Sequence, residues 1–375
     1  MCLFFAIGIS FIWYQFLGGK RWIAYDFHGE YELPTFAQKT NPDSIYTEDE
    51  FRKVLSSYSF FEQYNIDEII EDSIVVPGLK ATYTLEDYRD GSAGPGICTS
   101  MTPQGVTVTE NYVLVSAYCH TKKHNSVIYV IDRTTHKFLK EIVLFDKSHV
   151  GSIAYDSMHH NIWVCCHDDL SHFAYVRAFT LGQLQDYSFE ETGKPISYIL
   201  NYPIKTQKRA SFMTYYDEHL YVGYFSNKID SRTTVQRFDV ATNGELIVYP
   251  NMDKRELSEP DMTAFPSLKE YINGGMQGYA RDEDKTLILR SGGSHNDSIL
   301  MSFTNRPDDL GGVDLTDSQA DSKEKLPPLA EEICITDNQI YICFESSAFA
   351  FRGRNAAHVD RILVLDKNNE NCMDD

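Results

Sequence analysis

Histidine and acidic residues gather in the polar stretches between apolar segments of this sequence. Six of the twelve histidines lie in such stretches or just before an apolar segment, and several have acidic neighbours. These six are His120, His124, His149, His167, His172 and His295. Imidazole and carboxylate groups bind cations, hydrogen-bond polar ligands and carry protons. The residue types therefore indicate a polar binding site without selecting one reaction.

Signatures of well-known catalytic sites do not occur in the sequence. There is no nucleophile elbow, no glycine loop of the kind that cradles a phosphate, and no HExxH spacing. The eight cysteines show neither the paired spacing of zinc ligands nor a redox CxxC motif. Candidate residues must therefore be deduced from the elements that position them.

Short apolar segments with an alternating pattern dominate the chain after residue 98. Residues 103–144 contain four of them in succession, GVTVT, YVLVSAY, SVIYVID and FLKEIVL. Alternation with a period of two predicts short β-strands. The first pair of strands recurs four more times, each copy with an acidic residue at its turn. These turn residues are Glu110, Asp156, Asp217, Asp282 and Asp337.

The spacing of the turn residues predicts a β-propeller. They lie 46, 61, 65 and 55 residues apart, which leaves room for four strands and some longer loops. Repeats of about 40 to 50 residues with four strands each are typical of propeller blades. We therefore predict an all-β, five-bladed propeller in which residues 79–85 (LKATYTL) pair with the last blade and close the ring. Six blades are the alternative, because residues 197–204 (SYILNYPI) could belong to a further blade.

One repeat resembles known propeller families. In residues 127–144, VIYVIDRTTHKFLKEIVL, an apolar strand ends in Asp, turns through a Thr pair and returns through an outer strand. This pattern resembles the YVTN and NHL repeats, and the resemblance covers roughly residues 98 to 366. It implies the propeller architecture and says little about activity, because one fold hosts many functions.

The propeller topology places the polar loops at one end of the central channel. Loops that lead into the innermost strands and loops between the second and third strands open at the same end. We therefore predict a binding surface there for a protein partner or a surface glycan. Its predicted ligand-binding residues are Gln104, His120, His124, His149, His167, Asp168, Gln277, His295 and Glu345.

A metal-dependent hydrolase or lactonase is the alternative function. Glu332, Gln104 and Gln277 resemble, in type and placement, the residues with which gluconolactonase-like propellers hold Ca²⁺ at the channel mouth. Those enzymes supply mostly Asn and Asp, and the longer neutral amides of glutamine bind a hard dication less well. The sequence therefore favours binding over hydrolysis and leaves open whether the protein is an enzyme.

Four of the cysteines receive a structural interpretation. Cys98 and Cys119 flank the first hairpin and would lie near the same end of the blade, either as a disulfide or as free thiols. Cys165 and Cys343 fall in a column of small residues beside the innermost strands, where we predict buried thiols.

Charge and the N-terminal segment bear on partners and location. The formal net charge of −20 argues against nucleic acid as a partner, because acidic groups repel the phosphate backbone.

Residues 1–19 are apolar, nearly uncharged and without a small-residue cleavage site, which predicts a retained transmembrane signal-anchor. Lys20 and Arg21 after it favour a cytoplasmic propeller, whereas an acidic, tyrosine-rich propeller suits an outer surface. We expect the propeller to be extracytoplasmic.

The remaining segments flank or interrupt the repeats. Residues 20–77 are predicted to form a stalk and two short amphipathic helices, one with a capping box at Thr47 and one beginning at Asn65. The propeller is assigned to residues 78–366 and a polar tail to residues 367–375. Residues 253–275 and 308–328 are predicted to be long loops, the first with a helical turn at 267–272.

Overall fold

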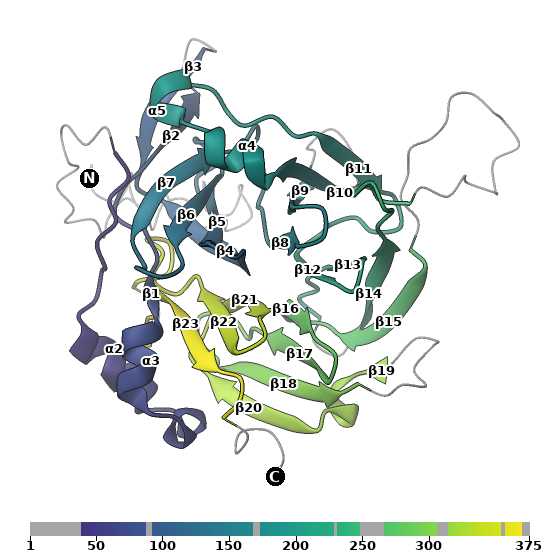
Figure 1. Cartoon of the computed structure of the whole chain (residues 1–375). Coiled ribbons are helices and arrows are strands. Elements are labelled where there is room, and N and C mark those ends of the chain that lie inside the picture. The colour runs from purple at the N-terminus through teal and green to yellow at the C-terminus, as the bar shows by residue number, and fades with distance from the viewer. Residues whose placement is uncertain are drawn as a thin grey trace, which may run out of the picture. The chain divides into compact units, whose positions relative to one another are not determined.

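Five antiparallel sheets follow one another around a ring in the computed structural model (Figure 1). The structure describes residues 39–87, 92–167, 173–228, 231–247, 266–305, 314–353 and 357–369. All of them belong to the unit Ala37–Asp375. Each sheet has four strands, and one sheet is extended by a fifth.

The sheets form consecutive blades along the chain. Blade 1 consists of β4 (Met101–Val108), β5 (Tyr112–Cys119), β6 (Val127–Asp132) and β7 (Phe138–Val143). Blade 2 consists of β8 (Ile153–Asp156), β9 (Asn161–His167), β10 (Ala174–Thr180) and β11 (Leu200–Ile204). Blade 3 consists of β12 (Phe212–Tyr216), β13 (His219–Gly223), β14 (Arg232–Asp239) and β15 (Leu268–Asn273), with β19 (Asp314–Leu315) added in parallel to β15. Blade 4 consists of β16 (Met276–Arg281), β17 (Lys285–Arg290), β18 (Ser298–Thr304) and β20 (Ser322–Leu326). Blade 5 consists of β21 (Ala330–Ile335), β22 (Gln339–Phe344), β23 (Arg361–Asp366) and β1 (Ile74–Val75).

The innermost strands close a complete circle. The strand β4 contacts β8, followed by β12, β16 and β21, and β21 contacts β4 again. The prediction of an all-β five-bladed propeller is therefore confirmed, and the six-bladed alternative is wrong. Residues 200–204, which suggested a sixth blade, form the outer strand of blade 2.

Acidic side chains stabilise the turns that carry the repeat. Asp156 accepts hydrogen bonds from the backbone N–H groups of Met158 and His159, and Asp282 accepts them from Asp284 and Lys285. Such bonds let an aspartate replace one backbone partner in a tight turn. At these two turns the acidic residue of the repeat therefore has a structural role.

The core lies between neighbouring blades, because each sheet buries both faces against the next. Between blades 1 and 2, for example, Leu114 and Val130 pack with Ile153, Ile162 and Val164. Trp163 is fully buried on the other face of blade 2, in the cluster shared with blade 3. The small residues of the inner column are buried as predicted, and Cys165 and Cys343 are free thiols.

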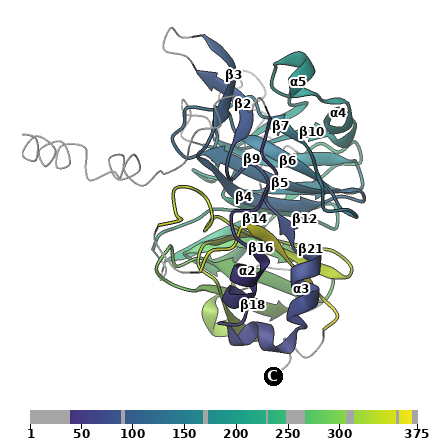
Figure 2. The same ribbon diagram turned by 90° about the vertical axis from the view of Figure 1, so that its left-hand side faces the viewer.

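The strand that closes the ring differs from the predicted one. Ile74 and Val75 of β1 pair with Ile362 and Arg361 of β23. Most of the predicted segment 79–85 instead belongs to β2 (Thr82–Asp87), which forms a separate hairpin with β3 (Ala93–Cys98). In both views this hairpin extends outward from the ring (Figures 1 and 2). Residues 82–87 have a pairing partner nearby in the sequence, the strand β3, and form a hairpin with it. The last blade therefore pairs with the shorter segment at residues 74–75.

Short helices precede the ring at its side. Thr47 caps α2 (Glu48–Leu55) through a capping box with Glu50, and Asn65 caps α3 (Ile66–Asp72). Together with η1 (Ser59–Gln63), these helices pack their apolar side chains on blades 4 and 5 (Figure 2). Two further short helices that the sequence analysis did not predict, α4 (Leu181–Asp186) and α5 (Phe189–Thr192), connect β10 and β11.

The two predicted loop regions contain strands where the structure describes them. Residues 268–272, predicted as a helical turn, lie in β15, and residues 322–326 form the outer strand of blade 4. Residues 253–265 and 308–313 lie outside the described residues. Both strands are short and contain Lys and Glu. Strands in the outer part of a blade are more exposed to solvent than inner strands, so their sequences lack the apolar alternation that predicts a strand.

The predicted membrane anchor at residues 1–19 lies outside the described residues. Among the residues that are described, no helix is long and apolar enough to span a bilayer.

Candidate functional site

Three innermost strands carry an extra residue at the loop end of the channel, and each extra residue is polar. The register of β16 on β17 skips Gln277, and that of β21 on β22 skips Glu331. In β4, Gln104 and Gly105 stand opposite the single residue Ser116. Such β-bulges turn a side chain away from the regular alternation. The bulges therefore bring Gln104, Gln277 and Glu331 from three strands to one place.

Glu345 joins these residues to form the floor of the channel mouth. It follows β22 and is 8% exposed. The Gln104 amide nitrogen donates to a Glu345 carboxylate oxygen at 3.0 Å and to its neighbouring Pro103 carbonyl at 2.7 Å. The carboxyl of Glu331 interacts with Glu345 and with the amide of Gln277. One polar cluster therefore spans blades 1, 4 and 5, in which Oε1 of Glu331 has no hydrogen bond of normal geometry to a described residue.

The two carboxyl groups of the floor retain protons more strongly than ordinary glutamates. Burial, with the charge of Glu345 as a further cause, raises the pKa of Glu331 well above its usual value. Burial also raises the pKa of Glu345, to about 7, although Gln104 and Glu331 act in the opposite direction. Two adjacent carboxylates cannot both ionise cheaply in a buried site. The floor thus presents both a proton donor and an acceptor near neutral pH.

Aromatic and histidine rings form the rim above this floor. The ring centroids of Tyr118 and His149 lie 4.1 Å apart, and His120 packs edge-on against Phe351 at 5.7 Å. Burial and the nearby charges of Glu345 and Glu331 raise the pKa of Tyr118 well above its usual value. Tyr118 therefore connects the rim to the floor. We call this whole set the mouth: Gln104, Tyr118, His120, His149, Gln277, Glu331 and Glu345.

His149 is the accessible ring of the mouth. Its side chain is exposed, although protein surrounds it on several sides. Partial desolvation in these concave surroundings, with the positive charges of Lys122, His120 and Arg209, lowers the pKa of His149 below its usual value. Because a neutral imidazole has one donor and one acceptor nitrogen, His149 can hydrogen-bond a neutral ligand.

The predicted metal set is divided by these hydrogen bonds. Gln104 binds Glu345 and Gln277 interacts with Glu331, whereas Glu332 lies next to Ser152 and the backbone of Ile333 and Tyr279. Neither carboxyl oxygen of Glu332 has a hydrogen bond of normal geometry to a described residue. Burial raises the pKa of Glu332 well above its usual value. The bulge at Glu331 explains why Glu332 is not at the mouth. It turns the side chain of Glu331 toward the mouth, where the sequence predicted Glu332, and turns Glu332 away.

The other predicted ligand-binding residues have different surroundings. His124 lies away from the mouth beneath the β2–β3 hairpin, and its backbone pairs with Glu86. His295 is exposed in the loop before β18, and no described interaction connects it to the mouth. His167 ends β9, but its side chain and Asp168 lie outside the described residues. Glu331 was not among the predicted residues. The other five residues of the predicted set lie at the mouth: Gln104, His120, His149, Gln277 and Glu345.

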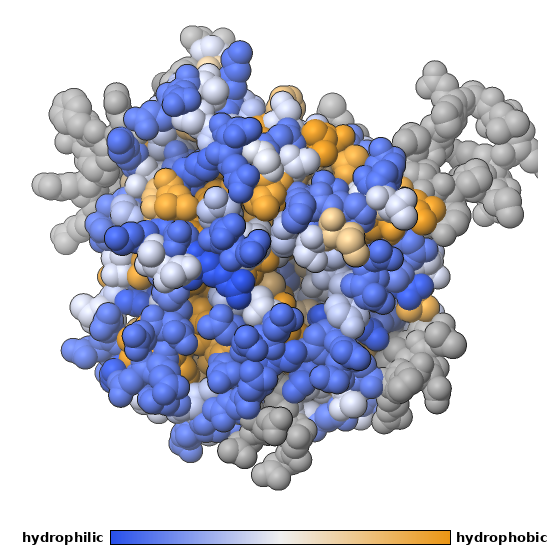
Figure 3. All heavy atoms as spheres, viewed as in Figure 1, coloured by the Kyte–Doolittle hydropathy of each residue, from blue (hydrophilic) through white to orange (hydrophobic). Residues whose placement is uncertain are grey.

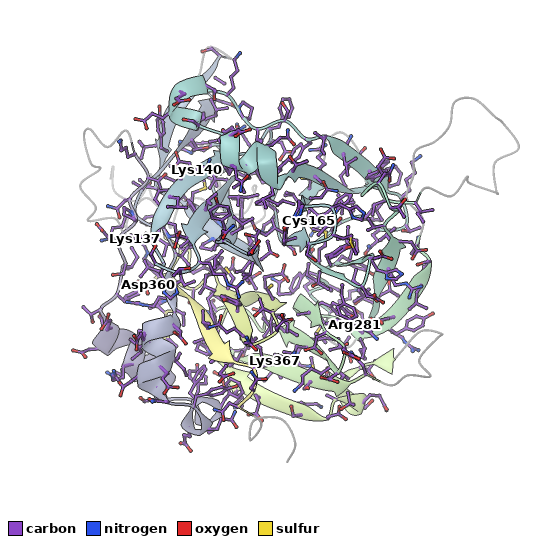
Figure 4. The ribbon with its side chains drawn as sticks, in the orientation of Figure 1. Lys137, Lys140, Cys165, Arg281, Asp360 and Lys367 are labelled. Carbon is purple, nitrogen blue, oxygen red and sulfur yellow. The ribbon has the colours of Figure 1, made fainter. Side chains whose placement is uncertain are left out.

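The opposite, turn end of the channel contains a cavity that the sequence analysis did not predict. Its volume is about 390 Å³, and it is lined by residues from all five blades, including Arg133, Tyr155, Tyr215, Arg281 and Cys334. Arg281, which is labelled in Figure 4, forms an ion pair of 2.8 Å with Glu270. Glu331 and Glu345 of the mouth do not line this cavity. The two ends of the channel thus differ, with arginine and tyrosine at one and acid and amide groups at the other.

The fold is assigned from the sheet topology. No family model matches the chain, and no curated protein matches it. The YVTN and NHL relation therefore stays a resemblance.

Similar solved structures include a GH43_1 enzyme from Xanthomonas citri, with 9% identity, a TM-score of 0.43, and coverage of 80% of this chain and 92% of that one. Hydrazine synthase of Kuenenia stuttgartiensis has 11% identity and a TM-score of 0.34, over 79% and 95% of the chains. An exo-β-1,3-galactanase of Phanerochaete chrysosporium has 9% identity and a TM-score of 0.42, over 79% and 64%. Similarity at this level transfers neither activity nor ligand.

Proposed function

We propose that the protein is a binding propeller that holds a hydroxyl-rich ligand, a neutral oligosaccharide of a surface glycan, at its mouth. The observation that carries the proposal is the cluster in which Gln104 and Gln277 hold the partly protonated acids Glu331 and Glu345 beneath the rings of Tyr118 and His149. Each of these groups is neutral or shares a proton, and together they offer donors and acceptors side by side.

The chemistry of the mouth suits hydroxyl groups better than ions. A sugar hydroxyl donates one hydrogen bond and accepts others, which matches carboxyl, amide and neutral imidazole groups. The exposed ring of His149, packed on the buried Tyr118, offers an apolar face for a sugar ring. A phosphate or sulfate would meet the acids of the floor. A protein partner, the other ligand expected from the sequence, would need a broader apolar surface than the polar groups of the mouth offer. The opposite, turn end of the ring, which faces the viewer in Figure 3, is largely hydrophilic with separate apolar patches.

A glycan array tests the proposal directly. The purified full chain is applied to neutral gluco-, galacto-, manno- and xylo-oligosaccharides, and the best ligand is titrated by calorimetry. We expect His149→Asn and Gln277→Ala each to weaken binding about tenfold or more, because each removes a hydrogen bond or a ring contact. His160→Asn is the matched control, since His160 is an exposed histidine at a turn of blade 2, away from the mouth. Absence of oligosaccharide binding, or equal loss in the control, would contradict the proposal.

A cation-dependent hydrolase is the second candidate, and one observation favours it. The buried oxygens of Glu332 lack hydrogen-bond partners among the described residues, and a bound cation would supply one. Ca²⁺ prefers six to eight oxygen ligands, of which Glu332 and the backbone carbonyls around it would provide some. Calcium analysis of the full chain decides between the two: about one equivalent in wild type that is lost in Glu332→Gln supports the hydrolase candidate.

We also propose that residues 1–19 anchor the propeller to a membrane and that the propeller lies outside the cytoplasm. The support is the apolar, nearly uncharged composition of that segment. Protease added to intact cells should digest the propeller if it is extracytoplasmic and spare it if it faces the cytoplasm. Recovery of the full chain in the soluble fraction would argue against an anchor.

A further inference from the structure

We propose that Cys98, Cys119 and His124 bind a zinc ion beneath the β2–β3 hairpin. Cys98 ends β3, Cys119 ends β5, and His124 lies in the loop between β5 and β6. One ligand atom from each residue lies within 4.8 Å of the other two, and all three residues are buried. This is the only group of three such side chains with this geometry among the described residues.

The measured distance agrees with tetrahedral zinc coordination. Zn–S and Zn–N bonds of about 2.3 and 2.05 Å at the tetrahedral angle place sulfur and nitrogen about 3.5 Å apart. Nδ1 of His124 lies 3.4 Å from Sγ of Cys119. Soft thiolate and imidazole ligands together select zinc over Ca²⁺ or Mg²⁺.

The surroundings of the ligand atoms are those of a metal site. Nε2 of His124 is buried without a hydrogen-bond partner, and the Glu86 carboxylate oxygen lies 3.8 Å from it. A carboxylate next to the second nitrogen of a metal-binding histidine orients the ring and increases its basicity. Each sulfur also has a hydrogen-bonding neighbour, the N–H of Ser100 at 3.4 Å for Cys98 and the hydroxyl of Thr121 at 3.2 Å for Cys119.

The site would add a metal link between two parts of the fold that already touch, for example where the Thr82 hydroxyl meets the Tyr129 hydroxyl at 2.6 Å. Cys98 and Glu86 come from the β2–β3 hairpin, whereas Cys119 and His124 come from blade 1. A zinc ion bound there would therefore attach the hairpin to blade 1. Three protein ligands leave a fourth position for water or another small ligand.

Metal analysis of the full chain tests the inference. The protein is purified under reducing conditions, incubated with a small excess of Zn²⁺ and dialysed. We expect about one zinc per chain. In Cys98→Ser, Cys119→Ser and His124→Asn, zinc should fall at least tenfold. Cys334→Ser is the matched control because Cys334 is a partly buried free thiol at the opposite end of the channel, and it should retain the metal.

Two further measurements do not depend on the folding of those variants. Co²⁺ in the wild-type site should give sulfur-to-cobalt charge-transfer absorption and the intense visible bands of tetrahedral coordination. Glu86→Gln should keep the stoichiometry at saturating zinc and weaken affinity about 10- to 100-fold, as expected for a positioning residue. Failure of reduced wild-type protein to bind zinc or cobalt would overturn the inference, as would a native Cys98–Cys119 disulfide that takes up no zinc after reduction.

Discussion

At the scale of single residues, the mouth depends on two carboxyl groups that share their environment. Glu345 and Glu331 are brought together by a bulge and by the residue that follows β22, and Gln104 and Gln277 orient them. A lone buried carboxylate would be costly, whereas a pair that shares a proton needs less solvation. The same arrangement makes the stability of the protein depend on pH.

The pKa of Glu345 predicts the sign of that dependence. Its folded pKa of about 7 exceeds the ordinary value of 4.5, so the folded state binds protons more tightly than the unfolded state. Stability from this group is complete below about pH 4.5 and is lost as the pH rises to about 7. Relative to Glu345→Gln, the wild type should lose up to about 1.4 kcal/mol of unfolding free energy per pH unit in this window. Chemical denaturation at several pH values measures the difference.

An exposed glutamate serves as the control for this measurement. Glu110→Gln at the first turn should change the unfolding free energy by less than about 0.5 kcal/mol, because Glu110 is exposed. Parallel curves for wild type and Glu345→Gln between pH 4.5 and 7 would show that Glu345 does not hold a proton in the folded state.

At the scale of elements, close packing of the innermost strands limits which residues they can contain. A Cβ at Gly105 would lie 2.7 Å from the Ser116 hydroxyl and 2.8 Å from the backbone nitrogen of Ile153 in the next blade. Ser116 itself bonds Gly105 N–H at 2.9 Å and the Val150 carbonyl at 2.8 Å. Blades 1 and 2 therefore meet backbone to backbone at this point.

Gly105→Ala is predicted to separate these two strands. Because the obstructing atoms include backbone, the clash cannot be relieved by one side chain, and we expect a loss of about 1–3 kcal/mol in unfolding free energy. Urea denaturation is the measurement. Gly353→Ala, where an added Cβ meets nothing within 4 Å, should stay within about 0.5 kcal/mol of wild type. Equal stability of the two variants would refute the close contact.

At the scale of the whole molecule, the ring is closed by strands from distant parts of the chain. The short strand β1 supplies the outer strand of blade 5, whose other strands begin at Ala330, Gln339 and Arg361, more than 250 residues later in the chain. Asp360 reinforces the closure by accepting hydrogen bonds from the N–H groups of Ile45 and Tyr46 at 2.6 and 2.8 Å. Opening this junction would expose the faces of both adjoining blades, so the ring should unfold as one unit.

Ile74→Ala tests the closure. Ile74 is buried in the core shared by blades 1 and 5, and its truncation leaves a cavity there. We expect a loss of about 2–4 kcal/mol with a single cooperative transition. Ile199→Ala changes the same side chain where it is 52% exposed and should cost less than about 0.5 kcal/mol. Similar losses for both variants would mean that β1 does not close the ring.

The sequence by itself determined the five blades and the identity of most inner-strand residues. Alternation and acidic turn residues such as Asp156 and Asp282 are local features, so they can be recognised without knowing what packs on them. The tertiary structure decided the rest. The bulge that turns Glu331 instead of Glu332 into the mouth, the hairpin that covers His124, and the closing role of Ile74 all depend on partners far away in the sequence. Such choices follow from competition between long-range pairings, which no local pattern records.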